Sequence, residues 1–101
     1  MTTPRMYVLV RLDLSETYRV VQGAHALAQY ALEHPEPFRQ WNNGCIVFLG
    51  VRNLIELRYW VSMVAGSGRI HSVFKEPDLD LHETAIACYD TGGIFKDLRT
   101  A

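Results

Sequence analysis

The stretch from Tyr18 to His34 has the residue pattern of one helix with two unlike faces. At about 100° per residue, its small and aliphatic residues fall on one side and predict a stripe that faces the core. This stripe consists of Val20, Ala24, Leu27, Ala28 and Ala31. A polar ridge lies roughly opposite and consists of Tyr18, Gln22, His25 and Gln29.

The polar ridge lacks the Glu, Lys and Arg that a solvated helix face usually carries. Gly23 and Ala26 flank it, and small residues allow another surface to approach closely. We therefore expect something to lie against this ridge. The alternative is that Gln22 and His25 simply bond to a neighbouring loop, because buried polar groups are normally satisfied within the protein.

The residues before this helix predict a strand and then a helix start. The aliphatic run at residues 6–11 has no alternation, which suits a strand covered on both faces. Asp13 and Glu16 have capping-box spacing and Ser15 is a second candidate cap, so the helix should begin between residues 13 and 16. It should end at His34, because a following proline disfavours the α conformation.

Residues 33–43 contain two prolines and two asparagines and predict a loop, with Phe38 and Trp41 anchored on the core. The run Cys45–Val51 gives the strongest signal for a buried strand.

A second helix is predicted to begin after Asn53, because Asn53 and Glu56 repeat the capping-box spacing. Its apolar positions are Leu54, Leu57, Trp60, Val61, Val64 and Ala65. The glycines at 66 and 68 should end it. Trp60 shares helical spacing with Leu57 and Val64, so we expect it in the core.

The last third of the chain predicts two more strands. These are residues 70–74 and residues 83–89, separated by an acidic loop at residues 75–82. After a turn at residues 90–93, three apolar residues are expected to pack on the sheet: Ile94, Phe95 and Leu98.

These elements predict a single α/β domain over residues 1–101. Alternation of strands and helices favours βαβ units with right-handed crossovers, and the closely following fourth strand favours a mixed four-stranded sheet with flanking helices, in two or three layers. Ligands of open α/β sheets bind where loops leave the carboxyl ends of strands. Here those loops are residues 12–17, 52–53 and 75–82.

Composition excludes several classes of protein. With 49% hydrophobic and 21% charged residues the chain is globular rather than disordered. Its formal net charge of -1 gives no basic surplus, so a nucleic-acid partner would need a local patch. No signal peptide or membrane span is recognisable, and we expect a cytoplasmic protein.

The cysteines and histidines give no sign of a metal site. Cys45 and Cys88 lie in separate apolar runs without CxxC spacing, which predicts buried, reduced thiols. The four histidines show neither HxxxH nor HExxH spacing, so only ligands from distant segments could assemble a metal site, and for that the sequence gives no positive signal.

The acidic loop supplies carboxylates next to a proline, at Glu76 and Asp78. If this loop approaches Gln22 and His25, a carboxylate would orient the imidazole, and the pair could position or deprotonate a water molecule. The alternative is an ordinary solvated acidic loop.

Several segments together resemble peptidyl-tRNA hydrolases of the second, archaeal and eukaryotic type, and especially their short bacterial and phage relatives. The segments are 6–11 (MYVLVR), 20–26 (VVQGAHA), 46–49 (IVFL), 76–79 (EPDL) and 84–87 (TAIA). The Gln-x-x-His-Ala element of the helix is the most specific of them, and the resemblance covers nearly the whole chain in the same order.

The resemblance implies a mixed four-stranded sheet flanked by helices, often assembled as a homodimer. It also implies hydrolysis of the ester between a peptide, or an N-blocked amino acid, and the 3' end of tRNA, without a metal or organic cofactor. Peptidyl-tRNA is then the expected partner.

An activated ester needs a positioned water, a base and donors for the developing oxyanion. On this hypothesis the catalytic residues are His25, Glu76, Asp78 and Thr84, and the substrate-binding residues are Tyr18, Arg19, Gln22 and Lys75. His25 with Asp78 or Glu76 would position water. Gln22 and Thr84 would bond around the carbonyl or ribose, and Arg19 would contact phosphate.

Two segments depart from the family pattern. Family members carry Gly-Lys-Gly-Lys before this helix, where the present chain has residues 15–19 (SETYR), with Arg19 as the only cation. Their Asp-Ala-Gly loop is replaced here by residues 76–78 (EPD).

The departures keep two alternatives open. One is a protein that binds the tRNA end or a nucleotide without hydrolysis, and the other is a protein-interaction module that uses the aromatic residues Trp41, Tyr59 and Trp60.

Overall fold

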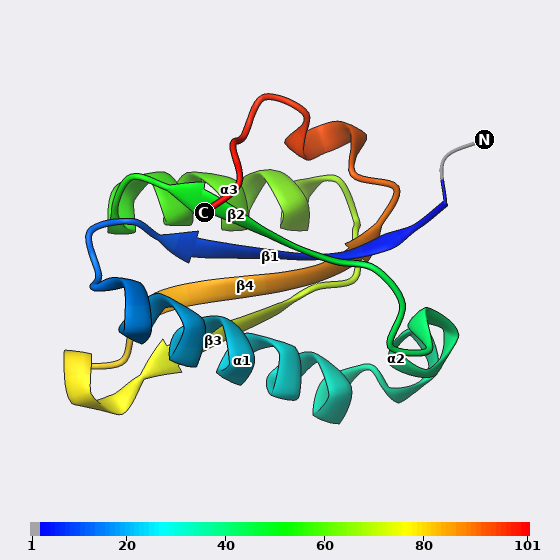
Figure 1. Ribbon diagram of the computed structural model, residues 1–101, viewed down its shortest axis with the longest axis horizontal. Coiled ribbons are helices and arrows are strands. Elements are labelled where there is room, and N and C mark those ends of the chain that lie inside the picture. Colours follow the sequence, from blue (N-terminus) through cyan, green and yellow to red (C-terminus); the bar gives the residue numbers. More distant parts are fainter. Residues whose placement is uncertain (1–2) are drawn as a thin grey trace.

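Among the described residues, four strands form one mixed sheet in the order β2-β1-β4-β3 (Figure 1). The computed structural model describes residues 3–101. Its strands and helices are β1 (Arg5–Arg11), α1 (Glu16–Glu33), α2 (Pro35–Trp41), β2 (Ile46–Val51), α3 (Leu54–Gly66), β3 (Ser72–Glu76) and β4 (His82–Asp90), with two 3₁₀ turns, η1 (Pro77–Leu79) and η2 (Gly93–Phe95). β1 pairs parallel to β2 and antiparallel to β4, and β4 pairs antiparallel to β3. The α/β class and the mixed four-stranded sheet are therefore confirmed.

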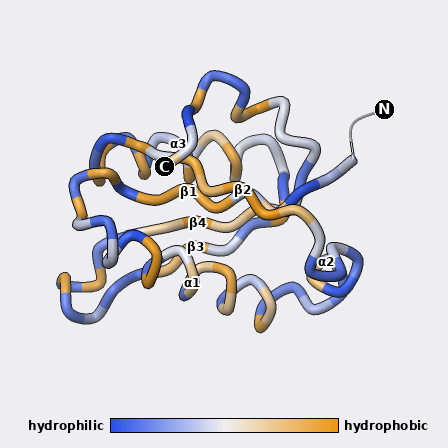
Figure 2. The backbone as a smooth tube through the Cα atoms, viewed as in Figure 1, coloured by the Kyte–Doolittle hydropathy of each residue, from blue (hydrophilic) through white to orange (hydrophobic). Residues whose placement is uncertain are grey.

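The sheet is the middle one of three layers. Helices α1 and α2 cover one face, and α3 with the C-terminal segment covers the other (Figure 1). Side chains alternate across β1, so Met6, Val8 and Val10 join the cluster under α1 while Tyr7 and Leu9 join the cluster under α3. The hydrophobic colouring is strong along β1 and β2, and further hydrophobic positions lie on α1 and α3 (Figure 2).

The predicted helix starts are confirmed, but the first helix uses its second candidate cap, Ser15, and not the Asp13–Glu16 capping box. The hydroxyl of Ser15 accepts the backbone N–H of Tyr18, while Asp13 instead pairs with Arg11 at 2.7 Å. At the start of α3 the side chain of Asn53 accepts the N–H of Glu56 at 3.0 Å. Each bond satisfies an amide that the first helical turn leaves without a backbone partner.

The prediction for the buried face of α1 was wrong at three of its five positions, although Leu27 packs against the core cluster under the helix as expected. Its buried residues are Gln22, Gly23, Ala26 and Tyr30, whereas the expected core residue Val20 is 60% exposed and Ala24 and Ala28 are also exposed. Gly23 explains the choice, because a Cβ at this position would overlap the ring of Phe48 from β2. A helix with this residue inward lies closer to the sheet than a bulkier face would allow. The expectation that another surface lies against the polar ridge is confirmed for Gln22.

The loop predicted at residues 33–43 contains a helix, α2. Pro35 and Pro37 fall within its first turn, where the backbone N–H groups have no helical partner, so prolines are tolerated there. The predicted anchors are confirmed: Trp41 is buried, its indole N–H donates to the carbonyl of Cys45 at 2.8 Å, and Phe38 packs against the same core cluster.

Three smaller predictions are also revised. Cys88 is buried as expected, but Cys45 is exposed: it directly precedes the edge strand β2, whose first residue Ile46 is exposed as well. β3 begins and ends two residues later than predicted, so Lys75 and Glu76 belong to the strand and not to the loop. Trp60 is only half-buried, although it packs against the core cluster under α3 as expected.

The C-terminal segment packs as predicted. Phe95 is buried against Tyr7 and Trp60, and Ile94 and Leu98 border the same cluster. Within residues 3–101, no helix combines the length and apolar character needed to cross a membrane.

The turn at Gly92 predicts a sharp difference between two adjacent glycines. Gly92 has a φ of +91°, and a Cβ there would overlap the buried ring of Tyr7, whereas a Cβ at Gly93 would meet open space. Gly92→Ala should lower the free energy of unfolding by about 3 kcal/mol, from backbone strain and overpacking together. Gly93→Ala should change it by less than about 0.5 kcal/mol. Urea denaturation of both variants checks this, and equal values would contradict it.

Candidate functional site

The carboxyl ends of β1, β2 and β3 lie at the same end of the sheet. β3 and β1 are both antiparallel to β4, so β3 runs parallel to β1 and β2. The first turns of α1 lie beside this end of the sheet and face β3 and β4 (Figure 1). Four polar side chains meet between the helix and these strands, and we call them the Gln22 cluster: Tyr18, Gln22, Glu76 and Thr84.

Both ends of the Gln22 amide are hydrogen-bonded. The hydroxyl of Thr84 donates to Gln22 Oε1 at 2.5 Å, and Gln22 Nε2 donates to Glu76 Oε1 at 2.9 Å. Tyr18 donates its hydroxyl to the same carboxylate oxygen at 3.1 Å. Gln22 and Thr84 are 0% exposed, so each of these polar groups depends on its partners in the protein.

Glu76 is held in its charged form. The hydrogen bond from Gln22 lowers the pKa of the Glu76 carboxyl, although burial acts in the opposite direction, and the bond from Tyr18 and the nearby imidazole of His25 lower it further. Conversely, burial and the bond to Glu76 raise the pKa of Tyr18. At neutral pH the cluster therefore contains a carboxylate and a neutral phenol.

The imidazole of His25 lies next to the cluster and is exposed to solvent. Its ring stacks on Phe74 of β3, with ring centroids 4.5 Å apart and planes 9° from parallel. A carboxylate was expected to orient this ring, but the Glu76 carboxylate bonds to Gln22 and Tyr18, and Phe74 supplies the contact that holds the imidazole. Phe74 was not among the predicted site residues, although its position two residues before Glu76 in a strand was a usable signal.

The other predicted site residues lie around this arrangement. Asp78 is exposed in η1, and Lys75 is exposed at an irregularity in the pairing of β3 with β4. Arg19 is on the other flank of α1, where its guanidinium donates to the carbonyls of Leu12 and Leu14, at 2.7 Å each.

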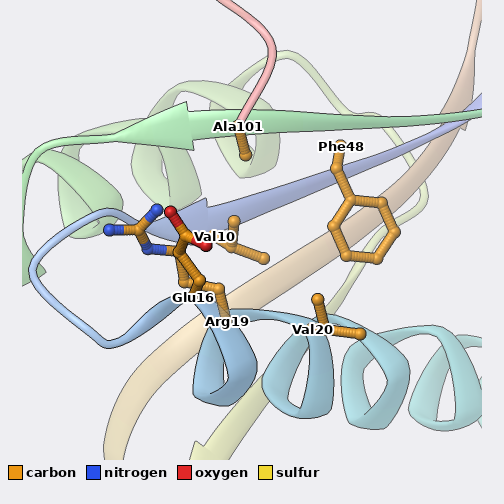
Figure 3. A pocket seen from close by; sticks show the side chains of 6 residues that line it. All are labelled: Val10, Glu16, Arg19, Val20, Phe48 and Ala101. Atoms are coloured by element: carbon orange, nitrogen blue, oxygen red, sulfur yellow. The ribbon is translucent and has the colours of Figure 1, made fainter.

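Arg19 also lines a surface pocket of about 570 Å³ together with Val20 and Phe48, and its side chain lies beside Glu16 at one side of the pocket (Figure 3). The structure thus brings together five of the eight predicted residues: Tyr18, Gln22, Glu76 and Thr84 are hydrogen-bonded, and His25 lies beside them. The side chains of Lys75, Asp78 and Arg19 lie outside this group.

No group of three or more His, Cys, Asp or Glu side chains among residues 3–101 has an arrangement that could hold a metal ion. Comparison of the chain with protein-family models gave no match, and comparison with curated proteins gave none either. Function is therefore inferred from the geometry of this site and the sequence pattern.

Removal of the Thr84 hydroxyl should destabilise the protein. Thr84→Val would leave Gln22 Oε1 buried without a donor, and an unsatisfied buried acceptor costs about 1–3 kcal/mol. Thr17→Val, on the exposed part of α1, should cost less than about 0.5 kcal/mol. Chemical denaturation measures both, and equal costs would show that the Thr84 bond contributes nothing to stability.

The lowered pKa of Glu76 predicts a pH-dependent contribution to stability. A carboxyl whose pKa is lower in the folded than in the unfolded state stabilises the fold above its unfolded pKa, and this stabilisation disappears as the pH falls through the folded value. The stability difference between the wild type and Glu76→Gln should therefore be larger at pH 7 than at pH 3. A difference that is independent of pH would contradict the assignment.

Proposed function

We propose that the protein hydrolyses the ester that joins a peptide, or an N-blocked amino acid, to the 3' end of tRNA, and that its fold is of the type II peptidyl-tRNA hydrolase kind. The observation that carries the proposal is the Gln22 cluster with His25 beside it. Gln22 and His25 come from the Gln-x-x-His-Ala element, and hydrogen bonds join Gln22 to Glu76 and to Thr84, residues 54 and 62 positions away. Three of the five segments that carry the resemblance, residues 20–26, 76–79 and 84–87, thus contribute to one site.

The chemistry of this site suits an ester that needs an activated water. His25 has an exposed imidazole that can take a proton from a water molecule as its oxygen attacks the ester carbonyl. The imidazolium can then give this proton to the 3' oxygen of the tRNA as the acyl–oxygen bond breaks, and the nearby anionic Glu76 would stabilise the imidazolium meanwhile. Phe74 restricts the tilt of the ring, so a water bonded to it is presented in a defined direction.

The buried members of the cluster take positioning roles on this hypothesis. Gln22 and Thr84 have no exposed surface, so they act on the substrate through Glu76 and do not contact its carbonyl or ribose directly. Tyr18 is half-buried and completes the bonds to the same carboxylate oxygen. Lys75, exposed at the end of β3, supplies a cation for a tRNA phosphate.

The deciding experiment measures release of N-acetyl-amino acid from N-acetyl-aminoacyl-tRNA by the purified protein, with free aminoacyl-tRNA alongside. We expect turnover of the blocked substrate only, and His25→Ala should reduce it roughly 100-fold or more, the usual contribution of a general base. Circular dichroism and thermal melting should show that this variant is folded. Full activity of His25→Ala would overturn its role.

Two neighbouring acids provide a matched pair for the same assay. Glu76 is buried and bonded to Gln22, whereas Asp78 lies exposed in the following turn. Glu76→Gln should therefore lower turnover strongly and Asp78→Asn should change it little. The reverse result would transfer the water-positioning role to Asp78.

A second candidate is a protein that binds the tRNA end without hydrolysing it. The state of Arg19 favours this candidate. Arg19 is the only cation in the segment where the family carries lysines, and its guanidinium already donates to two loop carbonyls, so it does not replace a free lysine. Salt-sensitive tRNA binding by folded protein without turnover would support this candidate against the hydrolase.

A further inference from the structure

The pocket beside Arg19 lies on the opposite flank of α1 from the Gln22 cluster. It has a volume of about 570 Å³ and is lined by Val10, Glu16, Arg19, Val20, Phe48 and Ala101. The side chains of Val10, Val20 and Phe48 form an apolar wall, and Glu16 and Arg19 lie together at one side (Figure 3). An apolar pocket with few polar groups is the usual form of a site for an apolar side chain.

One edge of this pocket is an outer strand of the sheet, and the chain already pairs a strand with it. β2 is the edge strand, and Leu49 bridges Thr100 in antiparallel register. The N–H of Gly50 donates to the carbonyl of Arg99 at 2.9 Å, and the N–H of Ala101 donates to the carbonyl of Phe48 at 3.0 Å. The β2 edge therefore accepts an extended backbone beside the pocket.

The alternation of side chains decides which position of the paired strand faces the pocket. Thr100 is paired with Leu49, whose side chain belongs to the core cluster under α3, so Thr100 points to that face. The next residue, Ala101, points to the α1 face and lines the pocket. Its single methyl group is small for a space of this volume, so a longer apolar side chain at the same strand position would reach further into it.

We propose that the β2 edge and this pocket form a binding groove for an extended peptide, with one apolar side chain in the pocket and residues 99–101 as an occupant that such a peptide displaces. Addition of a strand to an exposed sheet edge is a common mode of peptide recognition, in which backbone bonds supply affinity and a side-chain pocket supplies specificity. That the peptide is the peptidyl part of the substrate rests on the proposed function.

The lining favours a peptide over a nucleic acid. Phe48 and Gly50 offer a backbone acceptor and a donor at the spacing of a paired strand. Arg19 is the one cation among the lining residues, and its guanidinium already donates to two loop carbonyls. Few of its N–H groups are therefore left to bind a phosphate.

The first test titrates the full chain with the peptide acetyl-Arg-Thr-Leu-amide, which places leucine at the position of Ala101, and follows amide chemical shifts by NMR. We expect shifts at residues 48–50 and 99–101, and much weaker binding of acetyl-Arg-Thr-Asp-amide. Equal binding of the two peptides, or shifts elsewhere only, would overturn the proposal.

Two exposed residues of α1 provide a matched pair of variants. Val20 lines the pocket and is 60% exposed, and Leu32 is 79% exposed near the other end of the helix. Val20→Lys should abolish binding of the leucine peptide, whereas Leu32→Lys should leave it unchanged. Unaltered binding by Val20→Lys would contradict a side-chain pocket at this place.

The last residues provide a second pair. Ala101→Pro removes the N–H that donates to Phe48, so the chain's own strand should release the edge and the peptide should bind about fivefold tighter, the factor that one backbone hydrogen bond supplies. Thr100→Pro is the control, because in this register its N–H points away from β2. Weaker or unchanged binding by Ala101→Pro would show that residues 99–101 do not compete with the peptide.

These measurements separate the groove from the proposed function. They need no tRNA, so peptide binding without turnover would retain the groove and reject the hydrolase. Turnover without peptide binding would reject the groove alone.

Discussion

The two hydrogen bonds of the buried Gln22 amide determine how α1 sits on the sheet. One bond reaches β3 through Glu76 and the other reaches β4 through Thr84, so a rotation of the helix would leave buried donors and acceptors without partners. The small Gly23 beside it allows the helix to lie close enough for both bonds to form. The helix therefore presents a polar residue to the core and leaves Val20 and its apolar neighbours outside.

The same bonds that hold the helix prepare the candidate site. Because Gln22 and Tyr18 both donate to Glu76, the carboxylate stays ionised and close to His25, whose ring is already aligned by Phe74. A charge that is fixed before substrate arrives needs no rearrangement during the reaction. The same residues serve the structure and the proposed chemistry, so the activity of each variant is to be compared with its measured stability.

The orientation of α1 also determines which residues are exposed on the flank of the helix that faces away from the Gln22 cluster. With Gln22 inward, Val20 lies outside and borders the apolar pocket at the β2 edge, where residues 99–101 add a short strand. If the proposed function holds, the two flanks of α1 bind different parts of the substrate. The ester would lie on the Glu76 side and the peptide on the Phe48 side, with the first turns of α1 between the two.

The sequence by itself determined the elements that depend on near neighbours. Local patterns predicted the caps at Ser15 and Asn53, the strands and the mixed sheet. They also marked Gln22, His25 and Glu76 as candidate site residues. The helix in residues 33–43 could have been found from Pro35, since proline suits a first helical turn. Only the tertiary structure decided which face of α1 is buried. Periodicity defines two faces without ranking them, and burial of Gln22 becomes favourable only when partners 54 and 62 residues away satisfy its amide.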